Sequence, residues 1–267
     1  MTAYRHALPQ LSGGIFITDG GIETDLIFHE GLDLPSFAAF VLLVDDNGYE
    51  ALRKYFHSYA VLARGYQVGL VFETATWLSN HDWGTSLGYS QFALAQLNRK
   101  AVELLEEIRR QYENEKTKIV ISGCLGPRGD GYNPGILMSA KEAQAYHAEQ
   151  IGTFSQTEAD MVTAMTMTYA EEAIGIAEAA KSLGLPAVIS FTLEPDGKLP
   201  TGQTLKDALR QVDKSTANRP AYYMINCAHP SHFTNILGGG DSWLERIHGV
   251  RANASKKSHA DLDFHVK

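Results

Sequence analysis

Cysteine is scarce in this chain of 267 residues, and positive charge is not in excess. The two cysteines, Cys124 and Cys227, lie too far apart in the sequence to suggest a disulfide framework, and a chain of this length does not need one. Against 31 acidic residues there are only 23 basic ones, so the net charge is -8. We therefore expect a reducing compartment, and we expect neither nucleic acid nor an anionic membrane surface as a partner.

Long apolar runs are missing as well. No stretch of about 18 apolar residues occurs anywhere, and the first ten residues lack the continuous apolar segment of a secretory signal. The sequence therefore predicts a cytoplasmic protein that does not span a membrane. With 44% hydrophobic and 20% charged residues, the chain can bury the core of an ordinary globular protein.

The most regular feature that is present is an alternation of short apolar runs with longer stretches of helical period. Runs that are apolar at nearly every position are typical of parallel strands covered on both faces. The predicted strands are 15–19, 68–74, 118–123, 160–168, 187–193, 222–227 and 246–252. Caps and apolar stripes predict helices around 52–63, which we expect Gly65 to end, and around 94–108, 145–154, 170–177 and 204–212.

This pattern favours a single α/β domain over residues 1–267, because no linker or change in composition divides the chain. An open doubly wound sheet and a (β/α)8 barrel of the TIM type both fit seven strands that alternate with helices. Polar clusters follow nearly every predicted strand, and the carboxyl ends of all barrel strands meet at one rim. We therefore prefer the barrel.

One candidate for chemistry is the segment Asn226-Cys227-Ala228-His229-Pro230. A cysteine at the end of a buried strand is most often a small core residue. Here a polar residue precedes it and a helix-starting proline follows, which places the sulfur at a strand-to-helix turn. Partial exposure and the helix dipole favour a thiolate there, and a thiolate is both a nucleophile and a metal ligand.

Other strand ends carry weaker signals. Asp19-Gly20-Gly21 fits a turn with positive φ angles, or a loop whose backbone a ligand can approach. The glycine-rich stretch 123–131 matches no phosphate-binding fingerprint and fits a shaped loop that lines a pocket. Acid–base work by Glu73, Glu194 or Asp196 competes with salt bridges and helix caps as an explanation of these carboxylates.

Taken in order, several of these motifs resemble the homocysteine S-methyltransferase family from about residue 12 to about residue 260. The motifs are Ile17 to Thr24, Glu73-Thr74-Ala75-Thr76-Trp77, Gly123 to Gly131, Asp196-Gly197, Ile225-Asn226-Cys227 and Arg251-Ala252-Asn253. The resemblance implies a (β/α)8 barrel with Zn2+ at its carboxyl-terminal rim and Cys227 as one metal ligand. It also implies a substrate site formed by Asp19, Gly20, Gly21, Glu73, Thr74, Trp77 and Asn226.

Two departures from the family pattern qualify this expectation. The family's Gly-Gly-Cys-Cys motif after the eighth strand is missing, so we expect a C-terminally truncated barrel that lacks this strand. The strands at its open edges should associate with another chain, as in a homo-oligomer, or weaken the fold. The family also carries a glutamate on the fourth strand that binds the amino group of the substrate, and this chain has Met165 there.

The resemblance implies a zinc-dependent enzyme whose partners are a small amino-acid thiol and a methyl donor. The methyl group would move from a small sulfonium or ammonium donor to the thiol of homocysteine or a related acceptor. Two alternatives stay open at this stage. One is a (β/α)8 hydrolase or lyase that uses strand-end carboxylates, and the other is a catalytically incomplete remnant of the family.

Overall fold

A computed structural model describes residues 3–258 of the chain. In these residues seven strands follow one another through the sheet in chain order, from β1 to β7. Each strand coincides with one predicted run to within two residues at either end. The strands are β1 (Phe16–Thr18), β2 (Gly69–Glu73), β3 (Ile119–Leu125), β4 (Met161–Met167), β5 (Ala187–Phe191), β6 (Tyr222–Asn226) and β7 (Ile247–Arg251).

Helices separate the strands, and five of them were predicted from caps and apolar stripes. These are α2 (Asp46–Tyr66), α4 (Gln91–Tyr112), α5 (Ala140–Ser155), α6 (Ala170–Ser182) and α7 (Leu205–Thr216). Three shorter helices, of which only the start of the last was foreseen, are α1 (Ile22–Phe28), α3 (His81–Ser86) and α8 (Pro230–Leu237). Short 3-10 turns occupy Pro9–Leu11, Pro35–Phe37, Ala39–Val44 and Ser242–Arg246. None of the helices in residues 3–258 has both the length and the apolar character needed to cross a membrane.

Side-chain caps explain where several helices begin. Ser139 and Glu142 form a capping box at the start of α5. Glu142 Oε2 accepts from Ser139 N at 2.8 Å, and Ser139 Oγ accepts from Glu142 N at 3.3 Å. The prediction that Gly65 ends α2 was wrong. The helix continues to Tyr66, and Gln67 ends it in the left-handed conformation at φ 56°.

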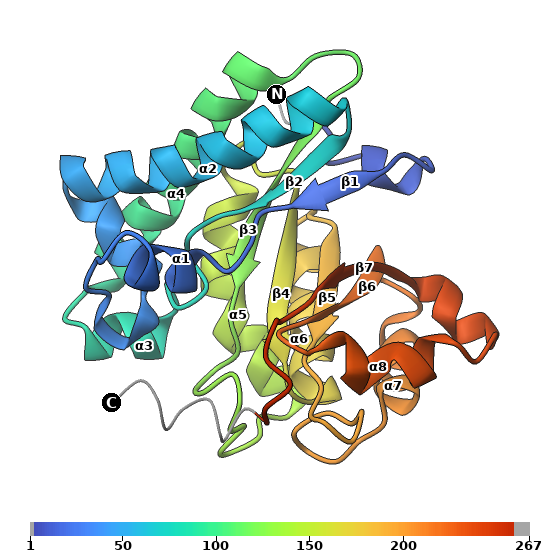
Figure 1. The fold of residues 1–267 in the computed structure, drawn as a ribbon. Helices are drawn as coiled ribbons and strands as arrows, with labels where there is room; N and C mark the ends of the chain where they lie inside the picture. The colour runs from blue at the N-terminus through green and yellow to red at the C-terminus, as the bar shows by residue number, and fades with distance from the viewer. Residues whose placement is uncertain (1–2, 259–267) are drawn as a thin grey trace. The chain divides into compact units, whose positions relative to one another are not determined.

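The described chain divides into two compact units. The first contains residues 1–125, 149–163 and 183–186, as far as they are described. Within it β1, β2 and β3 pair in parallel, with Phe16 opposite Gly69 and Leu70 opposite Ile119. As Figure 1 shows, α2 packs on β2 and on α4, and α4 packs on β3.

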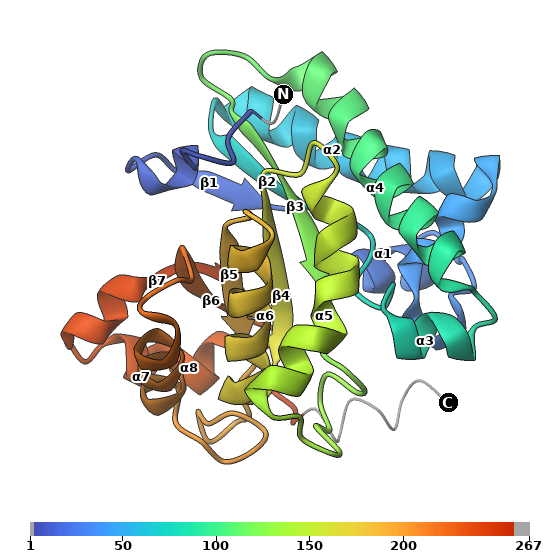
Figure 2. The ribbon, with the colours of Figure 1, turned by 180° about the vertical axis from the view of Figure 1, so that it is seen from behind.

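The second unit contains residues 126–148, 164–182 and the chain from 187 onward, as far as it is described. Within it β5, β6 and β7 pair in parallel, with one register shift between Tyr223 and Met224. Figure 2 shows α6 and α7 side by side, and α6 also packs on β5. Strand β4 contributes its first three residues to the first unit and the rest to the second.

The first and last strands, β1 and β7, are less buried than the five strands between them. Strands β2 to β6 are buried at every position, whereas β1 is half-buried and β7 alternates between half-buried and exposed residues. The long apolar runs of the inner strands follow from this burial. Association of the chain through β1 or β7 stays a prediction.

A buried polar cluster anchors the N-terminal segment in the first unit. Asp160 accepts hydrogen bonds from Tyr4 N, Arg109 Nη1 and Ile121 N, at 2.7–2.9 Å. Arg5 donates to the carbonyl oxygens of residues 155, 157 and 159. Burial raises the pKa of the Asp160 carboxyl, and the two backbone amides and Arg109 offset part of this rise.

Candidate functional site

In the first unit, two predicted carboxylates lie at the ends of adjacent strands. Asp19 follows β1 and Glu73 ends β2, and both are almost fully buried, at 2% and 3% exposure. Asp19 Oδ1 accepts a hydrogen bond from Glu73 N at 3.1 Å, which holds the two strand ends together. The structure therefore brings these two predicted residues side by side at the carboxyl end of the sheet in this unit.

The two glycines after Asp19 have a different explanation from the predicted turn. Neither Gly20 nor Gly21 has a positive φ angle, and Gly21 begins α1 as its N-cap at φ -77°. A side chain at Gly20 would collide with the hydroxyl of Tyr59, which reaches it from α2. Close approach of this tyrosine therefore requires glycine at position 20, and the expected positive-φ turn is corrected.

Thr74 is used within the fold. Its Oγ1 accepts from Cys124 N at 2.9 Å and lies 2.6 Å from Thr76 Oγ1, which in turn donates to Cys124 O at 2.8 Å. These buried hydroxyls extend the pairing of β2 with β3 beyond the last ladder bonds. The hydroxyl of Thr74 fixes the direction in which the chain leaves β2. Its predicted role in binding substrate stays a prediction.

Trp77 stands apart from its neighbours in exposure. Every other residue from 69 to 80 is buried, and Trp77 is half-buried. Gln150 on α5 anchors the loop that carries Trp77, because its Nε2 donates to Thr76 O and to Asn98 Oδ1, both at 3.1 Å. A loop anchored in this way, with one partly exposed indole, suits the predicted role of Trp77 as a wall of a pocket.

In the second unit, Cys227 lies at the predicted strand-to-helix turn. It directly follows β6, adopts a left-handed backbone at φ 53°, and is partly exposed. Its backbone N–H donates to Arg251 O at 3.1 Å, which ties the turn to the end of β7. Pro230 begins α8 as expected, and His229 Nδ1 accepts from Ser231 N at 3.1 Å as the helix cap.

Asn226 forms a buried network with two other strand ends of this unit. Its Oδ1 accepts from Thr166 N at 2.9 Å and from Ser190 Oγ at 2.6 Å, and its Nδ2 donates to Thr166 Oγ1 at 2.9 Å. The sequence analysis did not assign Thr166 or Ser190 to the site. The sequence feature that could have identified them is a hydroxyl side chain within or near the end of an otherwise apolar strand.

Two acidic residues near the end of β5 take part in a tight turn. Asp196 Oδ1 accepts from Lys198 N at 3.0 Å, and Glu194 N donates to Lys198 O at 2.8 Å. Gly197 lies between Asp196 and Lys198 at φ 78°, so the turn needs a residue that tolerates this conformation. Asp196 is exposed, and its carboxylate serves the turn.

The glycine-rich stretch 123–131 divides between a strand and a loop. Its first three residues belong to β3, and the loop begins at Gly126. Arg128 N donates to Glu172 Oε1 at 2.7 Å, and the same oxygen lies 2.9 Å from Nε2 of the buried His147. This contact joins the loop to α5 and α6, and sequence reasoning missed it because the partners are far apart in the chain.

The donors that the described residues supply do not amount to a zinc site. Among residues 3–258, no group of three or more His, Cys, Asp or Glu side chains is arranged to hold a metal ion. Cys227 is the single residue of this chain that matches a metal ligand of the family pattern, and one thiolate falls short of the three or four ligands of protein zinc sites.

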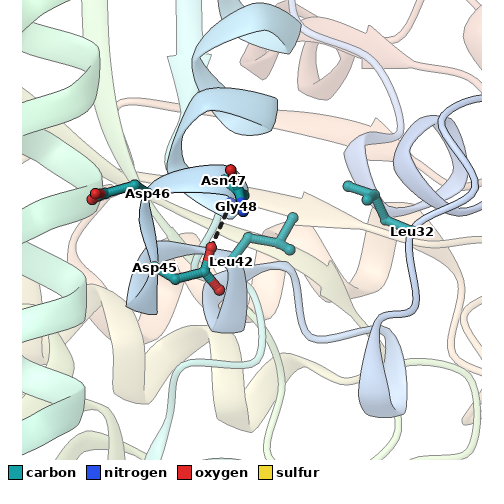
Figure 3. Close-up of a pocket in the computed structure, with 6 residues that line it drawn as sticks. All are labelled: Leu32, Leu42, Asp45, Asp46, Asn47 and Gly48. Atoms are coloured by element: carbon teal, nitrogen blue, oxygen red, sulfur yellow. Dashed lines mark hydrogen bonds between the residues drawn. The ribbon is translucent and has the colours of Figure 1, made fainter.

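One hollow of about 510 Å³ lies at the start of α2, apart from the predicted residues. Figure 3 shows Asp45 there, whose carboxylate accepts from Gly48 N at 2.8 Å and so caps the helix. The lining residues are Leu32, Leu42, Asp45, Asp46, Asn47 and Gly48. None of the predicted site residues belongs to this hollow.

Solved structures define the class of fold. The homocysteine methyltransferase MmuM from Escherichia coli matches in its metallated form with a TM-score of 0.73 at 20% identity, covering 94% of this chain and 96% of that one. Its oxidized form matches with a TM-score of 0.74 at 20% identity, covering 98% and 100%. With its seven parallel strands and intervening helices, this chain is an α/β protein of the TIM-barrel type.

Sequence comparison then identifies the family. The pattern of the homocysteine S-methyltransferase family matches residues 16–264, so the chain belongs to that family. Homocysteine S-methyltransferase 1 of Brassica oleracea var. italica is 24% identical over 255 residues, which cover 88% of this chain and 75% of the relative. The Arabidopsis thaliana protein of the same name is 23% identical over 244 residues, which cover 84% and 72%.

Proposed function

We propose that the chain is an S-methyltransferase that moves a methyl group from a small sulfonium or ammonium donor to the thiol of homocysteine or a related amino acid. The observation that carries this proposal is the family match over residues 16–264, combined with Cys227 at the turn after β6. Asp19, Glu73 and Cys227 all stand at carboxyl ends of strands, where barrels of this class place their chemistry.

The reaction is a displacement at carbon. The acceptor sulfur, as a thiolate, forms a bond to the methyl carbon while the bond from that carbon to the donor sulfur or nitrogen breaks. The electron pair of the broken bond stays on the donor, which leaves as a neutral thioether or amine. The thiol proton passes to a base or to water, so charge and atoms balance.

Met165 stands where the family pattern has the glutamate that binds the amino group of the acceptor. A thioether does not neutralise an ammonium ion, and Met165 is almost fully buried, two residues before the end of β4. We propose that the buried carboxylate of Glu73 takes this role. A buried carboxylate attracts a cation more strongly than an exposed one because the local dielectric constant is low.

A comparison of two acceptors tests the role of Glu73. Glu73→Gln should raise KM for homocysteine about tenfold or more and leave KM for 4-mercaptobutanoate, which lacks the amino group, nearly unchanged. Glu194→Gln serves as the matched control and should affect neither acceptor. Equal effects of Glu73→Gln on both acceptors would show that the carboxylate does not bind the amino group.

Zinc is the cofactor that the resemblance predicts, and its content can be measured directly. If Cys227 is a zinc ligand, the purified protein should carry about one zinc per chain, and the Cys227→Ala variant should lose it. Zinc retained at full occupancy by Cys227→Ala would rule out this ligand. Stable folding without zinc, together with no methyl transfer from any donor, would favour the catalytically incomplete remnant.

A further inference from the structure

Thr166 has a backbone conformation that its residue type disfavours. Seven residues other than glycine have a positive φ in the described part of the chain, and Thr166, at 63°, is the one that lies inside a β-strand. Two of the others, Gln67 and Ala217, end helices, where this conformation is common. A branched side chain in this region costs on the order of 1–3 kcal/mol, so the surrounding structure must hold it.

Asn226 supplies the interactions that hold this conformation. Its amide both accepts from the backbone N–H of Thr166 and donates to the hydroxyl of the same residue, so it fixes main chain and side chain together. Ser190 Oγ donates to the same amide oxygen and fixes its position from β5. All three residues are buried, at 3% exposure or less, so water does not compete for these bonds.

The position of the strained residue links it to the acceptor. Thr166 follows Met165, and a left-handed residue interrupts the two-residue alternation of side chains along a strand. The next residue after Asn226 is Cys227, which is left-handed too. Asn226 therefore holds one departure from regular strand geometry through its hydrogen bonds and directly precedes a second. Each departure lies at or beside a residue that the family pattern assigns to the site.

We propose that Asn226 is a positioning residue of the acceptor site, in place of the direct substrate contact expected from the sequence. This inference rests on the proposed function. Three hydrogen bonds to Thr166 and Ser190 occupy its amide. Through them Asn226 sets the direction of the Met165 and Thr166 side chains and the turn at Cys227, and acceptor affinity depends on that geometry.

The experiment compares acceptor and donor in a set of variants. Calorimetry should show homocysteine bound about tenfold or more weakly by Asn226→Ala, because a small misplacement of a binding group has a large effect. The KM of the methyl donor should stay within about twofold, since the change affects acceptor geometry alone. Ser190→Ala, which removes one of the three bonds, should weaken acceptor binding in the same direction but less.

A glycine at position 166 separates strain from packing. In the Asn226→Ala background, Thr166→Gly should restore most of the lost thermal stability, because glycine adopts φ 63° without strain. Acceptor affinity should recover only in part, because the threonine side chain is gone. Thr216→Ala, which removes another buried hydroxyl at the end of α7, is the control and should leave acceptor binding unchanged.

The outcomes separate this inference from the proposed function. If the unaltered protein binds no thiol and transfers no methyl group, both are wrong. If it binds homocysteine and folded Asn226→Ala or Ser190→Ala binds it equally well, only the positioning role is wrong. Equal weakening of donor and acceptor by Asn226→Ala would also overturn that role, because it indicates a general loss of structure.

Discussion

At the scale of single residues, glycines at strand ends make room for aromatic rings from helices. Gly20 accommodates the hydroxyl of Tyr59, and Gly123 faces the ring of Phe154, which a side chain there would approach to 2.5 Å. Both sites lie where the sequence suggested ligand-binding loops. Sequence alone did not show this because the aromatic partners are 31 to 39 positions away in the chain.

Gly123→Ala tests this packing argument. Phe154 is fully buried, so its ring has little room to move, and the added methyl group should cost about 1–3 kcal/mol of unfolding free energy. Urea denaturation gives the measurement. In a Phe154→Leu background the smaller side chain leaves space, so the cost of Gly123→Ala should fall; an undiminished cost would show that Phe154 is not the obstacle.

At the scale of elements, the sequence predicted strands better than helix ends. Runs of apolar residues located all seven described strands, because inner strands of a parallel sheet are buried on both faces. The short helices α1 and α3 were missed because each makes fewer than two full turns of periodic pattern. Gly65 was misassigned because a glycine can remain inside the last turn of a helix.

Gly65→Ala follows from this correction. Gly65 is exposed within α2, and a side chain there meets no atom within 4 Å. Alanine should stabilise the protein by about 0.5 kcal/mol, because it restricts the unfolded chain and favours the helix. Thermal unfolding gives the measurement, and a lower melting temperature would mean that position 65 does need glycine.

The site itself was predictable only in part from the sequence. The places of Asp19, Glu73 and Cys227 at strand ends were predicted, because polar residues after apolar runs indicate where strands end. Their roles in a site stay predictions. No pattern in the sequence indicates that the side chains of Thr74 and Asn226 form hydrogen bonds with neighbouring strands. Those bonds depend on register, which fixes the partner residues but leaves no local pattern.

At the scale of the whole molecule, the Asp160 cluster joins segments that are distant in the sequence. The ion pair between Asp160 and Arg109 is buried, with side-chain exposures of 0% and 11%. A buried pair adds little stability by itself, but removal of one partner leaves an uncompensated charge. The cluster lies at the amino end of β4, opposite the end that carries Met165 and Thr166, so it is separate from the proposed acceptor site.

Asp160→Asn should therefore reduce stability by about 3 kcal/mol or more, with little effect on KM of the folded protein. Urea denaturation measures the loss. Adding Arg109→Met to the Asp160→Asn variant removes the unpaired charge and should recover most of the lost stability. As a control, breaking the ion pair of Glu106 and Arg110 on the surface should cost under about 0.5 kcal/mol. A small loss in Asp160→Asn would contradict this account.

The contacts of Arg5 have a consequence for synthesis on the ribosome. Its guanidinium binds carbonyl groups that lie 150 to 154 residues later, and the first unit also includes residues 183–186. During translation the first unit therefore stays incomplete until residue 186 has left the exit tunnel, although its first three strands are made much earlier. In that interval the apolar strands of the nascent chain lack the later segments that complete the first unit.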